Sequence, residues 1–223
     1  METATLDGVA ARRSAIYWLL AEFFMNCPDE ALIARLHRDL AGVPTTGAAD
    51  SLTNGLSALR GALPAAGDTA GITKLAVEHT RLFGGIRSGY GLPPPYESLH
   101  RNASVASELT AAVAEFYSDA GFAAIDQAAP PDHLGVELRF ISLLCHGESE
   151  AWQEDRDTDA VLALERQRDF LNGHLLQWAP KFWDLVRQET QHEFFGRLAA
   201  FACTSVAEDH EFIKDLLAEL ERG

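Results

Sequence analysis

Apolar residues recur every three to four positions along most of the chain, the spacing that places them on one face of an α-helix. The first such segment covers residues 9–24, and a second begins after Asp29. Ser51, and Asp68 or Thr69, are suited to cap the next two helices, because their side-chain oxygens accept hydrogen bonds from free backbone N–H groups. No segment of the sequence shows the alternating pattern of a β-strand. The pattern therefore predicts an all-α protein.

Two stretches rich in glycine and proline interrupt the helical pattern. Residues 84–95 contain four glycines and three consecutive prolines, so they cannot form a helix. Helix is expected again from about residue 103 to 120, and a second break follows at residues 121–131. We take residues 122–131 as a hinge between an N-terminal lobe, 1–121, and a C-terminal lobe, 132–223. The prediction is one all-helical domain of roughly nine to eleven helices in two lobes.

The C-terminal part of the pattern predicts several element boundaries. Asp132 is suited to cap a helix, with His133 in its first exposed turn. Residues 148–159 hold six acidic residues and one basic residue, and are predicted to form a solvated turn. A later helix is expected to break at Pro180 because proline lacks the backbone N–H. Two final helices are expected, near residues 194–201 and 211–220.

The N-terminal segment resembles a twin-arginine export leader, because Arg12 and Arg13 precede an apolar run. However, Glu22 interrupts that run after seven residues, and no small-x-small cleavage pattern follows. We therefore predict an amphipathic core helix. No stretch approaches the roughly 20 apolar residues of a membrane span. The expected protein is soluble and cytoplasmic, with no membrane insertion.

The overall charge is strongly negative. The 223 residues include 33 acidic and 18 basic side chains, giving −15, and residues 132–223 alone contribute −10. Such a surface repels nucleic acid phosphates and anionic lipids and attracts a basic partner, including an arginine-bearing peptide. Simple solubility is the alternative explanation. The three cysteines are far apart in sequence, so buried free thiols in a reducing compartment are expected.

The sequence offers little support for catalysis. It contains no nucleophile elbow, no phosphate-binding loop with its Lys-Ser/Thr pair and no dinucleotide fingerprint after a strand. The main enzymatic alternative is a di-iron helical bundle, which uses Glu-x-x-His pairs. Two such pairs occur, Glu97/His100 and Glu189/His192, but two further inward glutamates cannot be placed. His133 is four residues before Glu137 and could form an acid–base or metal pair with it, although a structural helix start is the simpler interpretation. No metal and no cofactor are expected.

Three motifs in order carry a resemblance to a known family. They are residues 78–84, EHTRLFG; residues 93–98, PPPYES; and residues 131–140, PDHLGVELRF. Together with residues 174–180, HLLQWAP, they resemble the TorD/DmsD family of redox-enzyme maturation chaperones, which includes NarJ-like proteins. The resemblance covers nearly the whole chain.

The resemblance implies a chaperone, not an enzyme, for the catalytic subunit of a molybdopterin enzyme of the dimethyl sulfoxide reductase class. Such a chaperone binds the subunit's twin-arginine leader, its core or both, and assists cofactor insertion before export. A NarJ-like factor for a subunit that is never exported is the alternative. We expect a monomer, with a domain-swapped dimer as the other possibility.

The resemblance also implies a peptide-binding set. An apolar groove is expected from side chains of two motifs, and Asp132 is expected to accept hydrogen bonds from leader arginines. His133 is expected to make affinity depend on pH, since histidine ordinarily titrates near pH 6.5. His79 and Tyr96 stand where some family members have tryptophan. The predicted set is His79, Leu82, Phe83, Pro95, Tyr96, Glu97, Asp132 and His133.

Overall fold

The fold was analysed in a computed structural model, which describes residues 5–43, 50–84, 92–101, 106–122 and 129–222. These residues form ten α-helices and one π-helical turn, and no β-strand occurs among them. The predicted all-α class is therefore confirmed, and the number of helices lies in the expected range. None of the described helices is long and apolar enough to cross a membrane.

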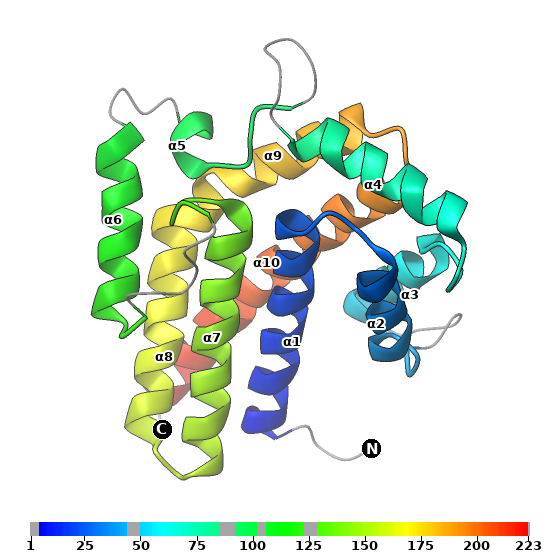
Figure 1. Cartoon of the computed structure of the whole chain (residues 1–223). Coiled ribbons are helices and arrows are strands. Elements are labelled where there is room, and N and C mark those ends of the chain that lie inside the picture. Colours follow the sequence, from blue (N-terminus) through cyan, green and yellow to red (C-terminus); the bar gives the residue numbers. More distant parts are fainter. Residues whose placement is uncertain (1–4, 44–49, 85–91, 102–105, 123–128, 223) are drawn as a thin grey trace. The chain divides into compact units, whose positions relative to one another are not determined.

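Figure 1 shows the helices in their order along the chain. Their bounds are α1 Leu6–Met25, α2 Glu30–Asp39, α3 Ser51–Ala62, α4 Thr69–Phe83, α5 Glu97–His100, α6 Ala106–Asp119, α7 Leu134–Gln153, α8 Asp157–Phe170, the π-helical turn η1 Leu171–Leu175, α9 Leu176–Glu189 and α10 Glu193–Leu220.

The chain forms two compact units, each assembled from separate segments of sequence. Unit 1 comprises residues 1–25, 96–179 and 207–223, and unit 2 comprises residues 26–95 and 180–206. These boundaries differ from the two consecutive lobes expected from the sequence, because α1 belongs with α7 and α8 rather than with α2 to α4. Most of the predicted hinge at 122–131 lies outside the described residues.

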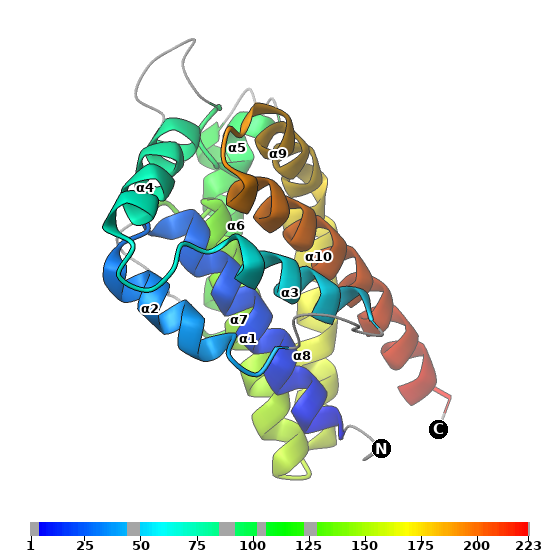
Figure 2. The ribbon, with the colours of Figure 1, turned by 90° about the vertical axis from the view of Figure 1, so that its right-hand side faces the viewer.

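Unit 1 is built on close packing between α1 and α7, which lie side by side (Figures 1 and 2). Gly135 at the start of α7 is in close contact with Met25 and the Ala21 carbonyl of α1, leaving no room for a larger side chain. The Arg139 guanidinium of α7 forms an ion pair with Glu22 at 3.0 Å and lies 4.6 Å from the centre of the Trp18 ring. Helix 1 is therefore a core element, as its apolar pattern predicted.

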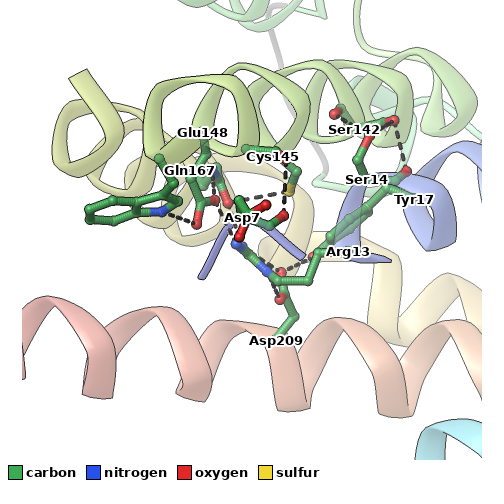
Figure 3. Close-up of polar contacts among 11 residues, drawn as sticks. Asp7, Arg13, Ser14, Tyr17, Ser142, Cys145, Glu148, Gln167 and Asp209 are labelled. Carbon is green, nitrogen blue, oxygen red and sulfur yellow. Dashed lines mark hydrogen bonds and ion pairs between the residues drawn. The ribbon is translucent and has the colours of Figure 1, made fainter. Parts of the chain in front are cut away.

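A buried polar network joins α1 to three other helices of unit 1 (Figure 3). The Arg13 guanidinium donates to Glu148 of α7 at 2.6 Å and also pairs with Asp209 of α10. Gln167 of α8 accepts a hydrogen bond from Arg13 and donates one to Glu148 at 2.9 Å. The Tyr17 hydroxyl donates to Asp209 at 2.8 Å. The carboxylates of the buried Glu148 and the half-buried Asp209 are thus both compensated.

Three expected boundaries in the C-terminal half were wrong. The predicted solvated turn at 148–159 is largely helix, because α7 continues to Gln153 and Glu148 faces Arg13. Pro180 lies inside α9, where the preceding π-helical turn widens the backbone and one missing N–H does not end the helix. The two expected final helices are one helix, α10.

Local capping signals were more reliable near the N-terminus. Asp29 accepts a hydrogen bond from the Leu32 N–H at 2.8 Å and caps α2, and Asp68 caps α4 through the Gly71 N–H at 3.0 Å. The cap of α3 is Asp50 rather than the expected Ser51, which is the first helical residue. Aspartate and serine are both good caps, and they stand next to each other in the sequence, so the pattern alone could not choose.

The cysteines occupy three different environments. All three are free thiols, but Cys27 is exposed, Cys203 is partly exposed and only Cys145 is buried. The expectation of buried thiols therefore holds for Cys145 alone. Burial raises the pKa of the Cys145 thiol well above its ordinary value, so this cysteine stays protonated near the Arg13 network.

Unit 2 has an aromatic core around α4. Phe83 lies 5.7 Å from Phe195 and 6.2 Å from Phe182, measured between ring centres. The Glu78 carboxylate of α4 accepts the Gln191 N–H at 2.6 Å and the Thr190 hydroxyl at 3.1 Å. These contacts hold the start of α10 and the end of α9 against α4.

The adjacent arginines offer a matched test of the network. Arg13→Ala removes the partner of two buried carboxylates, so it is expected to lower the free energy of unfolding by about 3–5 kcal/mol. Arg12→Ala at the neighbouring exposed position is expected to change it by less than about 0.5 kcal/mol. Urea unfolding followed by circular dichroism measures both. Equal effects of the two substitutions would contradict the role assigned to Arg13.

Candidate functional site

The predicted peptide-binding residues are divided equally between the two units. His79, Leu82, Phe83 and Pro95 belong to unit 2, and Tyr96, Glu97, Asp132 and His133 belong to unit 1. Each half has its own local structure, and they are described separately below.

The unit 2 half is part of the core. Leu82 is fully buried and Phe83 is 9% exposed, and Pro95 is buried as well. The His79 ring packs edge to face on the Phe83 ring, with the ring centres 5.0 Å apart. The centre of the Phe195 ring lies 6.1 Å from that of His79. Histidine therefore makes ring contacts at a position where tryptophan occurs in some family members. In this half the side chains stabilise α4 and present little surface to a partner.

The unit 1 half is a backbone junction between α5 and α7. Tyr96 and His133 form an isolated antiparallel β-bridge, and the Glu97 N–H donates to the Asp132 carbonyl at 2.9 Å. The Asp132 carboxylate accepts the Ser98 N–H at 3.2 Å. Asp132 thus satisfies the free N–H groups at the start of α5.

The expectation that Asp132 caps α7 was therefore wrong by one residue. The cap of α7 is His133, whose Nδ1 accepts the Gly135 N–H at 3.1 Å. Asp132 caps the short helix α5 instead, because the fold places α5 within reach of its carboxylate and sequence order does not reveal this.

Two aromatic side chains of the junction reach the surface. The rings of Tyr96 and His133 meet edge to face, with centres 5.3 Å apart, and both residues are half-buried. Their neighbours Glu97 and Asp132 are buried. Within the unit 1 half, Tyr96 and His133 are thus the side chains that an incoming peptide can touch directly.

A cluster of carboxyl groups lies beneath this ring pair. Glu97 and Glu137 are fully buried and Asp132 is 1% exposed. Glu97 forms ion pairs with Arg101 at 2.6 Å and with His174 Nδ1 at 3.0 Å. The cluster therefore holds three acids close to one arginine, all within unit 1.

Glu137 is the least compensated member of the cluster. Its Oε2 accepts the Trp178 indole N–H at 3.2 Å, whereas its buried Oε1 has no hydrogen-bond partner among the described residues. Burial raises the pKa of Glu137 well above its usual range, and the negative charges of Glu97 and Asp132 add to the effect. Glu137 therefore favours the neutral acid.

The pKa of Tyr117 is shifted by burial and by the same three carboxyl groups. Its hydroxyl donates to the Pro131 carbonyl at 2.8 Å. Burial raises the pKa of Tyr117 well above its ordinary value, and the charges of Glu137, Glu97 and Asp132 raise it further. Three carboxyl groups thus shape the electrostatics of the interior of unit 1 at this point.

Sequence reasoning missed most of this cluster. Glu137 was considered only as a partner of His133, and Arg101, His174 and Trp178 were not assigned roles. One usable signal was present: Glu137 is three residues from Leu134 and therefore on the inner, apolar face of its helix. A charged residue on such a face calls for a partner, but the sequence does not name it.

No metal centre is formed by the part of the chain that the structure describes, where no three histidine, cysteine or acidic side chains are grouped to hold an ion. Glu97, one of the di-iron candidates, is bonded instead to Arg101. The other candidate pair, Glu189 and His192, belongs to unit 2.

Unit 2 carries an apolar groove of about 550 Å³ along one face of α4. Val77 is a large apolar side chain exposed in it, and two acidic residues at the start of α2, Asp29 and Glu30, contribute to its lining. The lining side chains are otherwise small and contribute mostly carbon atoms. The groove is formed by Pro28, Asp29, Glu30, Thr69, Ile72, Thr73, Ala76, Val77 and Thr80.

The two units differ completely in charge. Unit 1 contains 24 acidic and 9 basic residues, whereas unit 2 contains 9 of each. The whole net charge of −15 is therefore carried by unit 1, which also contains the buried carboxyl cluster. Long-range attraction of a cationic partner is thus directed to unit 1.

Comparison with known proteins places the chain in a family. The nitrate reductase delta subunit family matches residues 46–184, more than half of the chain. The chain therefore belongs to this family of TorD-like maturation chaperones, which confirms the resemblance seen in the sequence.

Relatives match over most of the length or over parts of it. A chaperone protein TorD of Vibrio cholerae serotype O1 is 28% identical over 213 residues, covering 93% of this chain and 94% of the relative. A chlorate reductase assembly chaperone protein of Ideonella dechloratans is 38% identical over 72 residues, covering 32% of this chain and 36% of that protein. A crystal structure of an Archaeoglobus fulgidus protein assigned as a redox enzyme maturation protein is 22% identical. It covers 91% of this chain and 93% of that one with a TM-score of 0.51, which supports the fold.

The raised pKa of Glu137 predicts a pH-dependent stability. Unfolding returns this residue to its ordinary pKa, so its favourable contribution is complete at low pH and is lost as the pH rises through the folded-state value. The loss amounts to about 1.4 kcal/mol per pH unit while one proton is released on unfolding. In Glu137→Gln this slope is expected to disappear, so the variant gains stability relative to wild type as the pH rises above the ordinary pKa of glutamate.

Urea unfolding at several pH values measures this difference. Glu115→Gln serves as the control, because it removes a carboxylate from an exposed position of α6. The expectation fails if the difference in free energy of unfolding between wild type and Glu137→Gln stays constant with pH. Glu137 would then be ionised in the folded protein at every pH measured.

Proposed function

We propose that this protein is a maturation chaperone for the catalytic subunit of a molybdopterin oxidoreductase of the dimethyl sulfoxide reductase class. In this proposal it binds the subunit's twin-arginine leader in the cytoplasm and assists cofactor insertion before export. It acts by binding and carries out no catalysis itself. Membership of the family and a TorD relative aligned along 93% of the chain support the chaperone role.

The observation that carries leader binding is the ring pair above the carboxyl cluster. Tyr96 and His133 are half-buried, and the backbone bonds of Asp132 hold them in place before any partner arrives. A guanidinium group stacks favourably on a tyrosine ring and is attracted by negative charge beneath it. Because the pair is already ordered, little conformational entropy is lost on binding.

The buried members of the predicted set take supporting roles in this proposal. Asp132 and Glu97 attract the arginine through their charge and shape the backbone, while Tyr96 and His133 make the contacts. Leu82 and Phe83 stabilise α4 from the core of unit 2. In this proposal, Tyr96 and His133 are the two residues of the predicted eight that contact the leader arginine directly.

The apolar stretch of a leader also needs a surface. The groove on α4 offers one within unit 2, since its lining is mostly carbon and Val77 is 64% exposed. The lining positions of α4 recur at helical spacing over residues 69–80, about 16 Å along the axis. This length suits a short amphipathic segment, and Asp29 and Glu30 can meet its basic residues.

Calorimetric titration with synthetic leaders of molybdoenzymes encoded beside this protein tests the arginine contact. We expect micromolar or tighter binding that weakens when both leader arginines are changed to glutamine. Tyr96→Ala and His133→Ala are each expected to weaken binding about tenfold, equivalent to about 1.4 kcal/mol. Leu162→Ala, at an exposed apolar position of α8, is the control and should bind like wild type.

Either of two results would overturn the leader-binding proposal. One is the absence of binding to every such leader, which would leave a NarJ-like role on the folded subunit as the reading to test. The other is equal affinity for the arginine and glutamine peptides, because the proposed contact depends on the guanidinium charge.

The groove on unit 2 has a separate test. Val77→Asp places a charge in the apolar groove, and is expected to weaken leader binding at least tenfold without loss of stability, since the side chain is exposed. Leu162→Asp makes the same change on α8 and should leave the affinity unchanged. If both variants bind like wild type, the groove is not the site of the apolar stretch.

A further inference from the structure

The carboxyl cluster of unit 1 contains more acid than its local cations compensate. Arg101 and His174 both bond to Glu97, and no ion pair reaches Glu137 among the residues that the structure describes. One carboxylate oxygen of Asp132 accepts a hydrogen bond from the Ser98 N–H. The groups that face Glu137 from the surrounding elements are Glu97 of α5, Arg101 directly after α5, Tyr117 of α6, Asp132 before α7 and Trp178 of α9.

Geometry alone restricts the state of Glu137. Its side chain is fully buried, one oxygen accepts the Trp178 N–H and the other has no donor among the described residues. A second carboxylate charge beside Glu97, with the Trp178 indole as its donor and no cation bonded to it among the described residues, is costly to hold in the interior. A proton on Glu137 removes that cost, and the raised pKa of the group agrees with this state.

We propose that Glu137 is a specificity-determining residue that exchanges its proton for an arginine guanidinium arriving at the Tyr96–His133 surface. In the empty site Glu137 is a neutral acid. When the guanidinium binds, its positive charge favours the carboxylate, the proton passes to water and the O–H bond of the acid is the only bond broken. This exchange rests on the proposed leader binding. It defines what the site recognises: a cationic group, such as guanidinium, that stays protonated at every physiological pH.

The exchange has a thermodynamic signature, because proton release and cation binding are linked. Affinity for an arginine peptide should rise with pH by up to tenfold per unit while Glu137 starts out protonated, and level off above its titration. Glu137→Gln cannot release this proton, so its affinity should lose that slope and fall below wild type at high pH. A neutral glutamine peptide should release no proton in either protein.

Two imidazole side chains lie close to this site and must be separated from Glu137. His133 lies in the contact pair, and His174 is bonded to Glu97. Loss of a proton from either imidazole on arrival of a cation would give a slope of the same sign. Such a contribution survives in Glu137→Gln and disappears in His133→Gln or in His174→Gln, so the three variants assign the released proton.

The direct measurement is carbon NMR of the protein labelled with ¹³C at the glutamate carboxyl groups. The Glu137 resonance is identified by its absence in Glu137→Gln, and Glu115→Gln controls for removal of an exposed carboxylate. At pH 7 we expect the Glu137 carbon at the position of a protonated acid in the free protein. Addition of the leader should move it to the position of a carboxylate, with calorimetry in two buffers showing release of up to one proton per peptide.

A second probe, ethylguanidinium chloride, separates this inference from leader binding. If the leader does not bind but ethylguanidinium shifts the Glu137 resonance toward carboxylate, the exchange stands and the proposed leader binding fails. If the leader binds while the resonance stays unchanged, leader binding stands and the exchange is overturned. A carboxylate signal in the free protein at pH 7, or no response to either probe, also overturns the exchange.

Discussion

Burial of carboxyl groups is the constraint on which unit 1 depends, since a charge removed from water needs a partner or a proton. Glu148 is compensated by Arg13, and that pair joins α1 to α7. Glu97 is compensated by Arg101, the residue that follows the same short helix. Glu137 accepts the Trp178 indole N–H on one oxygen and has no partner on the other among the described residues, which leaves protonation as the way to neutralise it. The packing of α1, α5 and α7 follows from how these charges are satisfied.

The same constraint connects the fold to the proposed function. Asp132 caps α5 and holds the Tyr96–His133 ring pair, so the contact surface is ordered by groups that are themselves buried. Mutating such groups changes the position of the surface as well as its charge. Family membership identifies a maturation chaperone, and the carboxyl cluster provides a physical reason why its partner would be cationic.

Charge and apolar surface are assigned to different parts of the chain. Unit 1 carries the entire net charge of −15, whereas unit 2 has no net charge. The apolar groove along α4 belongs to unit 2. The C-terminal bias in charge was visible in the sequence, but the sharper division appears only when α1, α5 to α8 and the end of α10 are counted together.

The sequence by itself determined the features that depend on near neighbours: the all-helical class, the start of α2 after Asp29, a cap for α4 at Asp68 or the adjacent Thr69, and the core face of α1. Only the tertiary structure decided the partners of the buried charges. Glu148 was expected in a solvated turn, yet it is paired with an arginine 135 positions earlier, and the donors and acids around Glu137 come from α5, α6 and α9. Periodicity and capping act within one or two helical turns, whereas compensation of a buried charge depends on which distant segments the fold brings into contact.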